Sequence, residues 1–177
     1  RSVYSASVLH EGILAGKLPE MIMVFPNGGR ATMYQDAQGN VIPKLSSIGH
    51  LAVGVPGTVA GMDLALKKLG TRKWADLVEP ARRVAAEGFP VGYGLMTSLR
   101  REQKLLERFP ETKRIYLGNG RFLQEGEIFR QPELAATLTR LRDQGPREFY
   151  EGKTAQLLVA EVKRGGGLIT LEDLKNY

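Results

Sequence analysis

Two histidines are the first residues to consider for catalysis or metal binding, because imidazole titrates near neutral pH and is a common metal ligand. His10 and His50 lie far apart, and neither belongs to a ligand spacing such as HExxH. His50 lies beside a glycine-rich segment, where a hydrogen-bonded structural role is the simpler interpretation. The sequence has no cysteine, which excludes disulfides, thiolate metal sites and cysteine nucleophiles. We therefore predict no metal site and no cofactor.

Carboxylates and hydroxyls offer no clearer catalytic group. Two pairs of acidic residues could supply a general acid and a general base, Glu125 with Glu127 and Glu172 with Asp173. Both pairs lie in polar segments where carboxylates stay solvated, so neither is typical of an acid–base pair. No serine lies in a GxSxG elbow. The residues taken alone predict no active site.

A glycine-rich stretch at residues 49–61, GHLAVGVPGTVAG, is the strongest backbone signal in the chain. It begins as an apolar run typical of a strand and passes through Gly54, Pro56 and Gly57 toward a helix. Such a turn can cradle a phosphate at the helix N-terminus, but neither GxGxxG nor GxxxxGK[ST] is present. We interpret Gly54, Pro56 and Gly57 as a structural turn.

The elements after this turn are predicted to be mostly helical. One helix is expected from Thr58, acting as N-cap, to Gly70, acting as a left-handed C-cap. Trp74 is expected to anchor the next helix in the core. Pro80 is expected to interrupt that helix and to start another one, which Gly88 ends.

The second half of the chain continues this pattern, and its predicted elements give an α+β fold that is mostly helical. A helix is expected over about residues 92–108, and a hairpin turn at Gly118-Asn119-Gly120, flanked by Ile115, Leu117, Phe122 and Leu123. The next helix is expected from Pro132 to Gly145, with an apolar stripe of Leu134, Leu138 and Leu141. A further helix is expected over KTAQLLVAEVKR, and a capping box at Thr170–Asp173.

Composition indicates one domain or a large piece of one. The chain has 177 residues, of which 42% are apolar and 25% charged, and no apolar run is long enough for a membrane helix. The net charge is +6, which would suit nucleic acid or an anionic surface. However, charges of both signs alternate in RREQKLLERFPETKR, as on a solvated helix face. We expect no nucleic-acid partner, no membrane span and no signal peptide in the chain.

Six segments, read together, resemble the large-subunit region of γ-glutamyltranspeptidases (γ-glutamyltransferase, glutathione hydrolase). They are MYQDAQGNVIP, SSIGHLAVGVPGTVAG, EPARRVAAEGFPV, GEIFRQPELAATL, GPREFYEGKTAQLL and GGGLITLEDLKNY, in the family's order and spacing. The resemblance divides the chain into a divergent segment, residues 1–32, and a truncated large-subunit-like helical region, residues 33–177.

The resemblance implies part of an N-terminal nucleophile hydrolase with an αββα sandwich. In this family a precursor cleaves itself, and the new N-terminal threonine of the small subunit attacks the γ-glutamyl amide of glutathione. The γ-glutamyl group then passes to water, an amino acid or a peptide, without a cofactor. The implied partners are therefore the small subunit, glutathione and acceptor amino acids or peptides, in a periplasmic or extracellular location.

Departures from the family pattern bear on activity. The nucleophile's Thr-Thr-His context is absent from the chain, so no residue is assigned as catalytic. The family's Arg-Glu-Met-Ala-Pro-like motif, whose arginine holds the substrate α-carboxylate, falls on residues 22–26, where only Pro26 agrees and Ile22 replaces the arginine. Arg30 is nearby but out of register, and it is the candidate for substrate binding. The chain alone is expected to be inactive. The alternative is a non-catalytic helical interaction module derived from such an enzyme.

Overall fold

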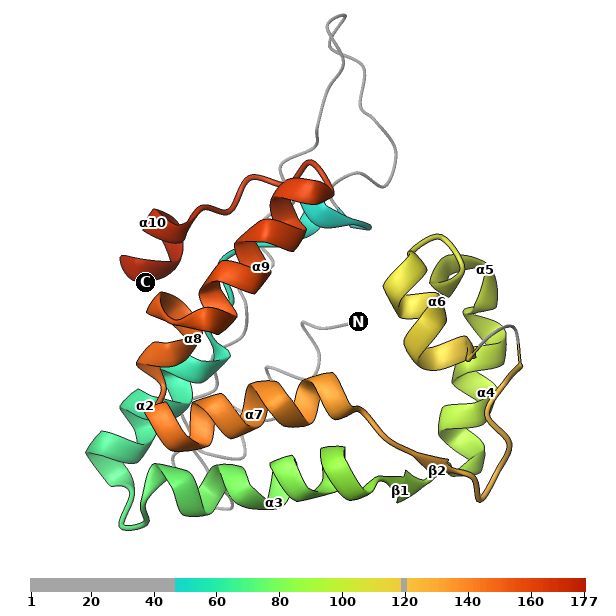
Figure 1. Ribbon diagram of the computed structural model, residues 1–177, viewed down its shortest axis with the longest axis horizontal. Helices are drawn as coiled ribbons and strands as arrows, with labels where there is room; N and C mark the ends of the chain where they lie inside the picture. Colours follow the sequence, from blue (N-terminus) through green and yellow to red (C-terminus); the bar gives the residue numbers. More distant parts are fainter. Residues whose placement is uncertain (1–46, 119–120) are drawn as a thin grey trace, which may run out of the picture. The chain divides into compact units, whose positions relative to one another are not determined.

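The computed structural model describes residues 47–118 and 121–177, which fall into two units, one ending at Val53 and the other running from Gly54 to Tyr177 (Figure 1). His10, Ile22 and Arg30 lie outside the described residues. The elements are η1 (His50–Ala52), α2 (Thr58–Leu69), α3 (Trp74–Glu87), β1 (Phe89–Pro90), α4 (Tyr93–Arg101), α5 (Gln103–Leu106), α6 (Pro110–Leu117), β2 (Ile128–Phe129), α7 (Pro132–Gln144), α8 (Arg147–Glu151), α9 (Lys153–Arg164) and α10 (Leu171–Lys175). The mostly helical character predicted from the sequence is confirmed for these residues. None of their helices has the length and apolarity to cross a membrane.

In the described part of the first unit, the apolar run before Gly54 is a turn of 3₁₀ helix, η1, and not the predicted strand. Ala52 N–H donates to Gly49 O at 3.0 Å, which closes the turn. Gly49 has a φ of 94°, a backbone angle that a side chain would disfavour.

Helix α2 has the predicted extent, but both of its predicted caps are wrong. Thr58 is the first helical residue, and the N-cap is Gly57, which has no side chain to accept a hydrogen bond. Gly70 is extended, with φ −87° and ψ 152°, and not left-handed. A glycine is needed at position 70 because a Cβ there would collide with the Leu66 side chain and come within 2.6 Å of Leu66 O.

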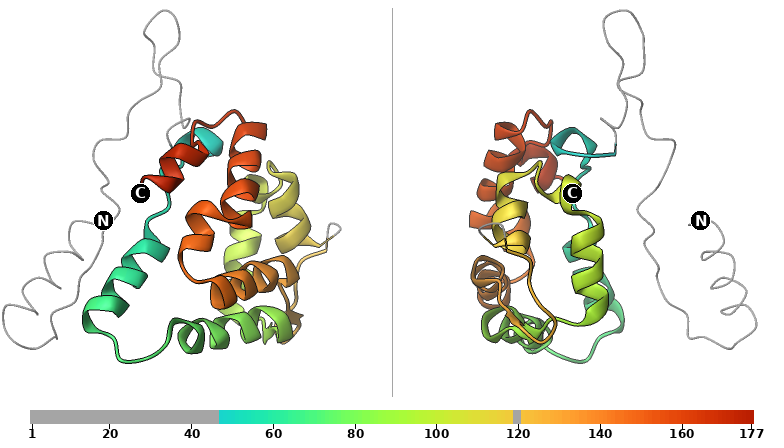
Figure 2. Two further views of the ribbon diagram at one scale, coloured as in Figure 1. Left: turned by 60° about the vertical axis from the view of Figure 1, so that its left-hand side comes forward. Right: turned by 90° about the vertical axis from the view of Figure 1, so that its right-hand side faces the viewer.

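Helix α3 is one continuous helix, so the predicted break at Pro80 is wrong. A proline inside a helix removes one backbone hydrogen bond and costs about 3 kcal/mol. That cost is offset by packing, because α3 lies along α7 in all views (Figures 1 and 2). Trp74 anchors the pair as expected, since its indole Nε1–H donates to Leu141 O at 2.7 Å. Gly88, with φ 86°, ends the helix as predicted.

The middle of the chain differs most from the sequence-based prediction. The expected helix over residues 92–108 is two helices, α4 and α5, that meet at Glu102. The expected hairpin is wrong on its N-terminal side, because Ile115 and Leu117 belong to helix α6, which Pro110 begins. Residues 119–120 at its turn lie outside the described residues. Strands β1 and β2, which helices α4, α5 and α6 separate along the chain, pair with each other instead, antiparallel, with Phe89 opposite Phe129.

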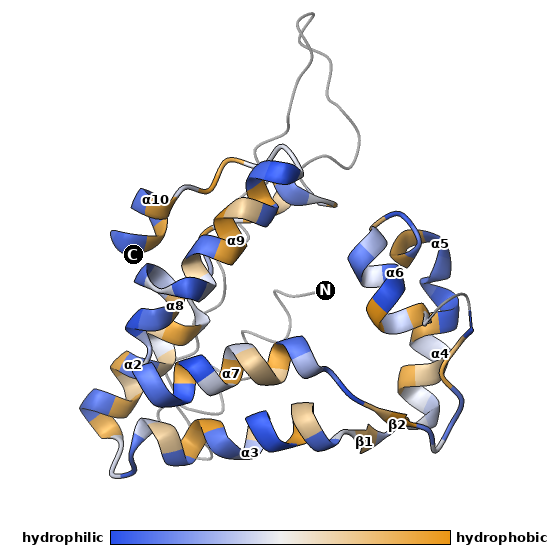
Figure 3. Cartoon of the chain, in the orientation of Figure 1, coloured by the Kyte–Doolittle hydropathy of each residue, from blue (hydrophilic) through white to orange (hydrophobic). Residues whose placement is uncertain are grey.

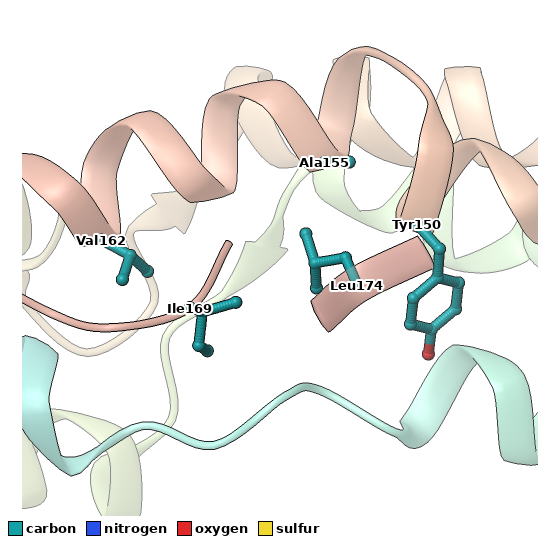
Figure 4. Packing of buried hydrophobic residues seen from close by; sticks show 5 residues of the cluster. All are labelled: Tyr150, Ala155, Val162, Ile169 and Leu174. Carbon is teal, nitrogen blue, oxygen red and sulfur yellow. The ribbon is translucent and has the colours of Figure 1, made fainter. Parts of the chain in front are cut away.

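The C-terminal helices follow the prediction closely. Gly145 ends α7 with φ 85°, and Thr170 accepts a hydrogen bond from Asp173 N–H in a complete capping box before α10. In the predicted leucine stripe of α7, Leu141 is buried but Leu134 is 42% exposed. The core of this region joins α8, α9, the loop after α9 and α10, and its buried residues are Tyr150, Ala155, Val162, Ile169 and Leu174 (Figure 4).

Candidate functional site

The hydroxyl of Tyr150 joins α8 to the glycine-rich segment before α2. Tyr150 Oη donates to Pro56 O at 2.7 Å and accepts from Ala60 N–H at 3.0 Å. Figure 4 shows this hydroxyl pointing toward the segment that leads into α2. The first N–H groups of a helix lack partners within it, and Gly57 offers no capping side chain. The Tyr150 hydroxyl, from a helix distant in sequence, therefore accepts the hydrogen bond that an N-cap side chain would usually accept.

A second tyrosine covers the first. The rings of Tyr150 and Tyr177 stack with centroids 5.9 Å apart and an interplanar angle of 13°. A Cβ at Gly57 would collide with the Tyr177 hydroxyl, so the small residue at 57 permits this close approach. Burial raises the pKa of the Tyr150 hydroxyl, which is only 2% exposed as a residue. Its proton therefore stays in place to bond Pro56 O at neutral pH.

Of the three predicted turn residues, the structure brings Pro56 and Gly57 to this tyrosine pair. Gly54 lies in open space, with no atom within 4 Å of the position its Cβ would occupy. Sequence reasoning missed both tyrosines as partners of the turn. Two general rules gave the available signal. A buried tyrosine needs a hydrogen-bond partner for its hydroxyl, and a helix that starts without a capping side chain has backbone N–H groups that need an acceptor.

A buried carboxylate, Glu148, holds α7, α8 and α9 together. Its Oε1 accepts from Thr154 N–H at 2.9 Å, at the start of α9, and from Arg140 Nε at 3.2 Å. Arg140 also donates to the hydroxyls of Thr154 and Thr137. Glu148 Oε2 is buried and has no hydrogen-bond partner among the described residues. The carboxylate is neutralised by an arginine and favourably placed at a helix N-terminus, which suits a structural role.

The two carboxylate pairs singled out in the sequence are also engaged in local structure. Glu127 accepts from Arg121 Nη2 at 2.6 Å and from Gln124 N–H. Asp173 accepts from the hydroxyl and the N–H of Thr170, at 2.7 and 2.8 Å. These bonds, the hydroxyl first, lower the pKa of Asp173. Neither pair is arranged as an acid facing a base across a cavity.

One cavity of about 260 Å³ lies at the N-terminus of α7, and its lining includes Arg114, Arg130 and Glu133. Arg114 is already paired, with Glu133 at 2.9 Å and with Glu111 at 2.8 Å. His50 lies in η1, in the other unit. Over residues 47–118 and 121–177, no three acidic or histidine side chains gather closely enough to hold a metal ion. The described side chains build a framework and contain no complete catalytic set.

The sequence from residue 24 to residue 177 matches the model of the family Gamma-glutamyltranspeptidase. The chain is 42% identical over 154 residues to the glutathione hydrolase proenzyme of Pseudomonas aeruginosa, a match that covers 87% of this chain and 27% of that protein. It is 40% identical over 146 residues to the glutathione hydrolase proenzyme of Escherichia coli, covering 82% of this chain and 25% of that protein. The chain thus spans about a quarter of the length of these relatives.

Solved structures give the same relationship in three dimensions. The fold aligns with the crystal structure of Helicobacter pylori gamma-glutamyltranspeptidase at a TM-score of 0.79 and 40% identity, over 82% of this chain and 42% of that one. It aligns with gamma-glutamyltranspeptidase from Pseudomonas nitroreducens at a TM-score of 0.71 and 42% identity, over 87% of this chain and 45% of that one. Sequence and fold therefore agree that the chain belongs to the γ-glutamyltranspeptidase family.

Proposed function

We propose that this chain is the helical framework of a γ-glutamyltransferase/glutathione hydrolase, an enzyme whose nucleophile resides on a second polypeptide. The observation that carries the proposal is the match itself, which includes residues 24–177 but only 27% of the P. aeruginosa proenzyme. The polar groups of the described residues support the division of labour. Tyr150, Glu148 and Asp173 are all committed to helix termini and not to a reacting centre.

The proposed partner is the γ-glutamyl small subunit that begins with a threonine. Its hydroxyl oxygen would attack the γ-carbonyl carbon of glutathione while its own amine takes the proton and returns it to the departing nitrogen. Water or the amine of an acceptor amino acid or peptide would then release the γ-glutamyl group from the threonine. Backbone N–H donors would stabilise the oxyanion. The proposed architecture is the αββα sandwich, with its strands supplied outside the described residues, since β1 and β2 are two residues each.

Release of p-nitroaniline from γ-glutamyl-p-nitroanilide, with glycylglycine as acceptor, tests this proposal. The purified chain alone should release none. The chain mixed or co-expressed with the remaining part of the P. aeruginosa glutathione hydrolase, which begins after the matched region, should turn the substrate over. Turnover by the chain alone would show that a threonine of this chain is a nucleophile and would overturn the proposal.

The alternative function is a non-catalytic helical interaction module derived from such an enzyme. It is favoured by the exposure of helix α2, which is rich in apolar residues and has none that is buried. A module would bind its partner without any hydrolysis in the assay above. A reading frame beside this one that encodes a Thr-Thr-His segment would favour the enzyme instead.

Arg30 is proposed to hold the α-carboxylate of the γ-glutamyl substrate. Hydrogen bonds between charged groups contribute about 1.5–3 kcal/mol, which is roughly ten- to hundredfold in affinity. In the reconstituted enzyme, Arg30→Ala should therefore raise KM for γ-glutamyl-p-nitroanilide at least tenfold with little change in kcat. Arg83→Ala, which removes an exposed arginine of α3, is the control and should leave KM unchanged. An unchanged KM in Arg30→Ala would remove the assignment.

The proposed location is the periplasm or the extracellular space. Its basis is the family resemblance, since the relatives above include bacterial glutathione hydrolase proenzymes. Fractionation of the source cell with an antibody to residues 47–177 tests it, and recovery in the cytoplasmic fraction alone would refute it.

A further inference from the structure

Helices α4, α5 and α6, within residues 93–117, form a small body that we call the α4–α6 lobe. Both α4 and α6 contact α5 more extensively than they contact any other described helix. Leu99 of α4 and Leu117 of α6 are buried, and Figure 3 shows hydrophobic as well as hydrophilic residues in all three helices. The three helices are therefore amphipathic, as helices that pack on one another are expected to be.

The α4–α6 lobe is inserted between the two strands of the sheet. Strand β1 ends at Pro90 and β2 begins at Ile128, and these two residues pair with each other. The chain therefore leaves the strand pair for the lobe and returns to it at the same point, and Figure 1 shows the three helices joined to the rest of their unit at β1 and β2. Val91 N–H donates to Glu127 O and Gly126 N–H donates to Val91 O, both at 2.8 Å. One narrow connection, extended by these two bonds, carries the lobe.

The glycines on the lobe side of this connection have open surroundings. Apart from the chain neighbours, no atom of the described residues lies within 4 Å of the position that a Cβ would occupy on Gly92 or Gly126. On the other side of β1, a Cβ on Gly88 would come within 2.7 Å of Phe129 O. A glycine in open surroundings can change its backbone angles without a steric clash, whereas Gly88 is fixed against β2. The strand pair therefore stays with α3, and the chain can turn at Gly92 and Gly126.

The seam between the lobe and the segment from β2 to α7 is loosely packed. Arg114 Nη2 donates to Glu133 Oε1 at 2.9 Å across it, and the ring centroids of Tyr116 and Phe129 lie 5.6 Å apart. Arg114 and Glu133 also line the cavity of about 260 Å³, whereas well-packed protein interiors have few voids larger than a water molecule. Both side chains of the ion pair are at least half exposed, so the pair contributes little to stability. The closed position of the lobe is therefore held weakly.

We propose that the α4–α6 lobe swings as one body about Gly92 and Gly126, with the ion pair between Arg114 and Glu133 as the latch of its closed position. Opening moves α6 away from the N-terminus of α7 and widens the cavity between them. The small core of the lobe moves with it, because α4 and α6 are both packed on α5. The inference concerns the helices of this chain and is independent of the proposed function.

Distances between spin labels test the movement, because the chain has no cysteine and takes a thiol label only where a cysteine is introduced. The 177-residue chain labelled at Lys113→Cys in α6 and Gln144→Cys in α7 should give two distance populations in pulsed electron paramagnetic resonance. Two control pairs should each give one narrow population. They are Thr97→Cys with Lys113→Cys, within the lobe, and Arg83→Cys with Gln144→Cys, across the α3–α7 pair. All four positions are exposed, so the labels should leave the fold intact.

The latch is tested by two matched substitutions in the chain labelled at positions 113 and 144. Glu133→Gln removes the ion pair across the seam and should increase the longer-distance population about two- to threefold. Glu111→Gln removes the other partner of Arg114, a glutamate of the same 62% exposure in the first turn of α6, and should leave the populations unchanged.

Salt should act on the latch in the same direction as Glu133→Gln. Raising NaCl from 0.05 to 0.5 M, roughly a threefold decrease in Debye length, should increase the longer-distance population in the wild type but not in Glu133→Gln. A single narrow population between positions 113 and 144 would overturn the swing, and a broad one between positions 97 and 113 would show that the lobe does not move as one body. Equal populations in Glu133→Gln and Glu111→Gln would overturn the latch.

Discussion

At the scale of single residues, the hydroxyl of Tyr150 combines two tasks that usually fall to separate groups. It accepts from the third N–H of a helix and donates to a carbonyl that precedes the same helix. A glycine at the N-cap can be kept because this distant hydroxyl satisfies the N–H. The segment from Val55 to Gly57 is thereby held by tertiary structure and not by its own turn chemistry.

Removal of this hydroxyl should destabilise the chain measurably. Tyr150→Phe leaves Pro56 O and Ala60 N–H without a protein partner in a partly buried place, which costs roughly 1–3 kcal/mol. Urea unfolding followed by circular dichroism measures this. Tyr93→Phe is the control, since Tyr93 is 67% exposed, and it should change the unfolding free energy by less than about 0.5 kcal/mol. Equal stability of the two variants would contradict the role given to Tyr150.

At the scale of elements, the α3–α7 pair shows packing overriding local sequence. Pro80 favours a break, yet α3 continues because Trp74 and Ala85 hold it to α7 at both ends. Gln131 N–H donates to Ala85 O at 2.9 Å, which ties the start of α7 to the last turn of α3. The two helices also share the Glu79–Arg142 ion pair at 2.6 Å.

Replacement of Pro80 by alanine should therefore stabilise the chain. Pro80 is exposed, so no packing is lost, and the helix regains a backbone hydrogen bond. Alanine also gives the unfolded chain more conformational freedom than proline does, which reduces the gain. The unfolding free energy should therefore rise by about 2 kcal/mol. Pro132→Ala is the matched control, because a proline at the start of α7 removes no intrahelical bond and its replacement should not stabilise. A less stable Pro80→Ala variant would show that the proline is needed for the packing of α3.

The ion pairs of Glu79 should make the free energy of unfolding depend on pH in the acidic range. Hydrogen bonds from Arg82 and then Arg142 lower the pKa of Glu79 from 4.5 to about 2. A carboxyl whose pKa is lower in the folded state stabilises the fold above its unfolded pKa, and this stabilisation disappears as the pH falls toward 2. Tm measured from pH 6 to pH 2 should therefore fall less steeply in Glu79→Gln than in the wild type. The exposed Glu125→Gln serves as control, and a Glu79→Gln curve parallel to the wild type would refute the coupling.

At the scale of the whole molecule, charge and exposed apolar surface act in opposite directions. Large apolar side chains are exposed on several helices, including Met62 and Leu69 of α2 and Leu77 and Val84 of α3. The net charge of +6 keeps copies of the chain apart by repulsion. The balance between the two should depend on ionic strength, because salt shortens the range of the repulsion.

Association of the isolated chain should consequently increase with salt. At low ionic strength, sedimentation velocity should find a monomer, and raising NaCl from 0.05 to 0.5 M, roughly a threefold decrease in Debye length, should produce larger species. Leu69→Lys should reduce these species. Binding to an acidic partner should show the reverse dependence and weaken with salt. A chain that stays monomeric and melts cooperatively at every salt concentration would contradict an exposed apolar surface of this extent.

The sequence by itself determined the family, the mostly helical character and the features set by neighbouring residues. Gly88 and Gly145 end helices and Thr170 with Asp173 caps one, because the backbone freedom of glycine and the reach of a threonine hydroxyl act within a few residues. Tertiary structure alone decided the continuity of α3 through Pro80, the pairing of Phe89 with Phe129 and the union of Tyr150 with Pro56 and Ala60. These depend on groups distant in sequence, whose packing and hydrogen bonds outweigh local preference, and no periodicity or spacing encodes which distant groups will meet.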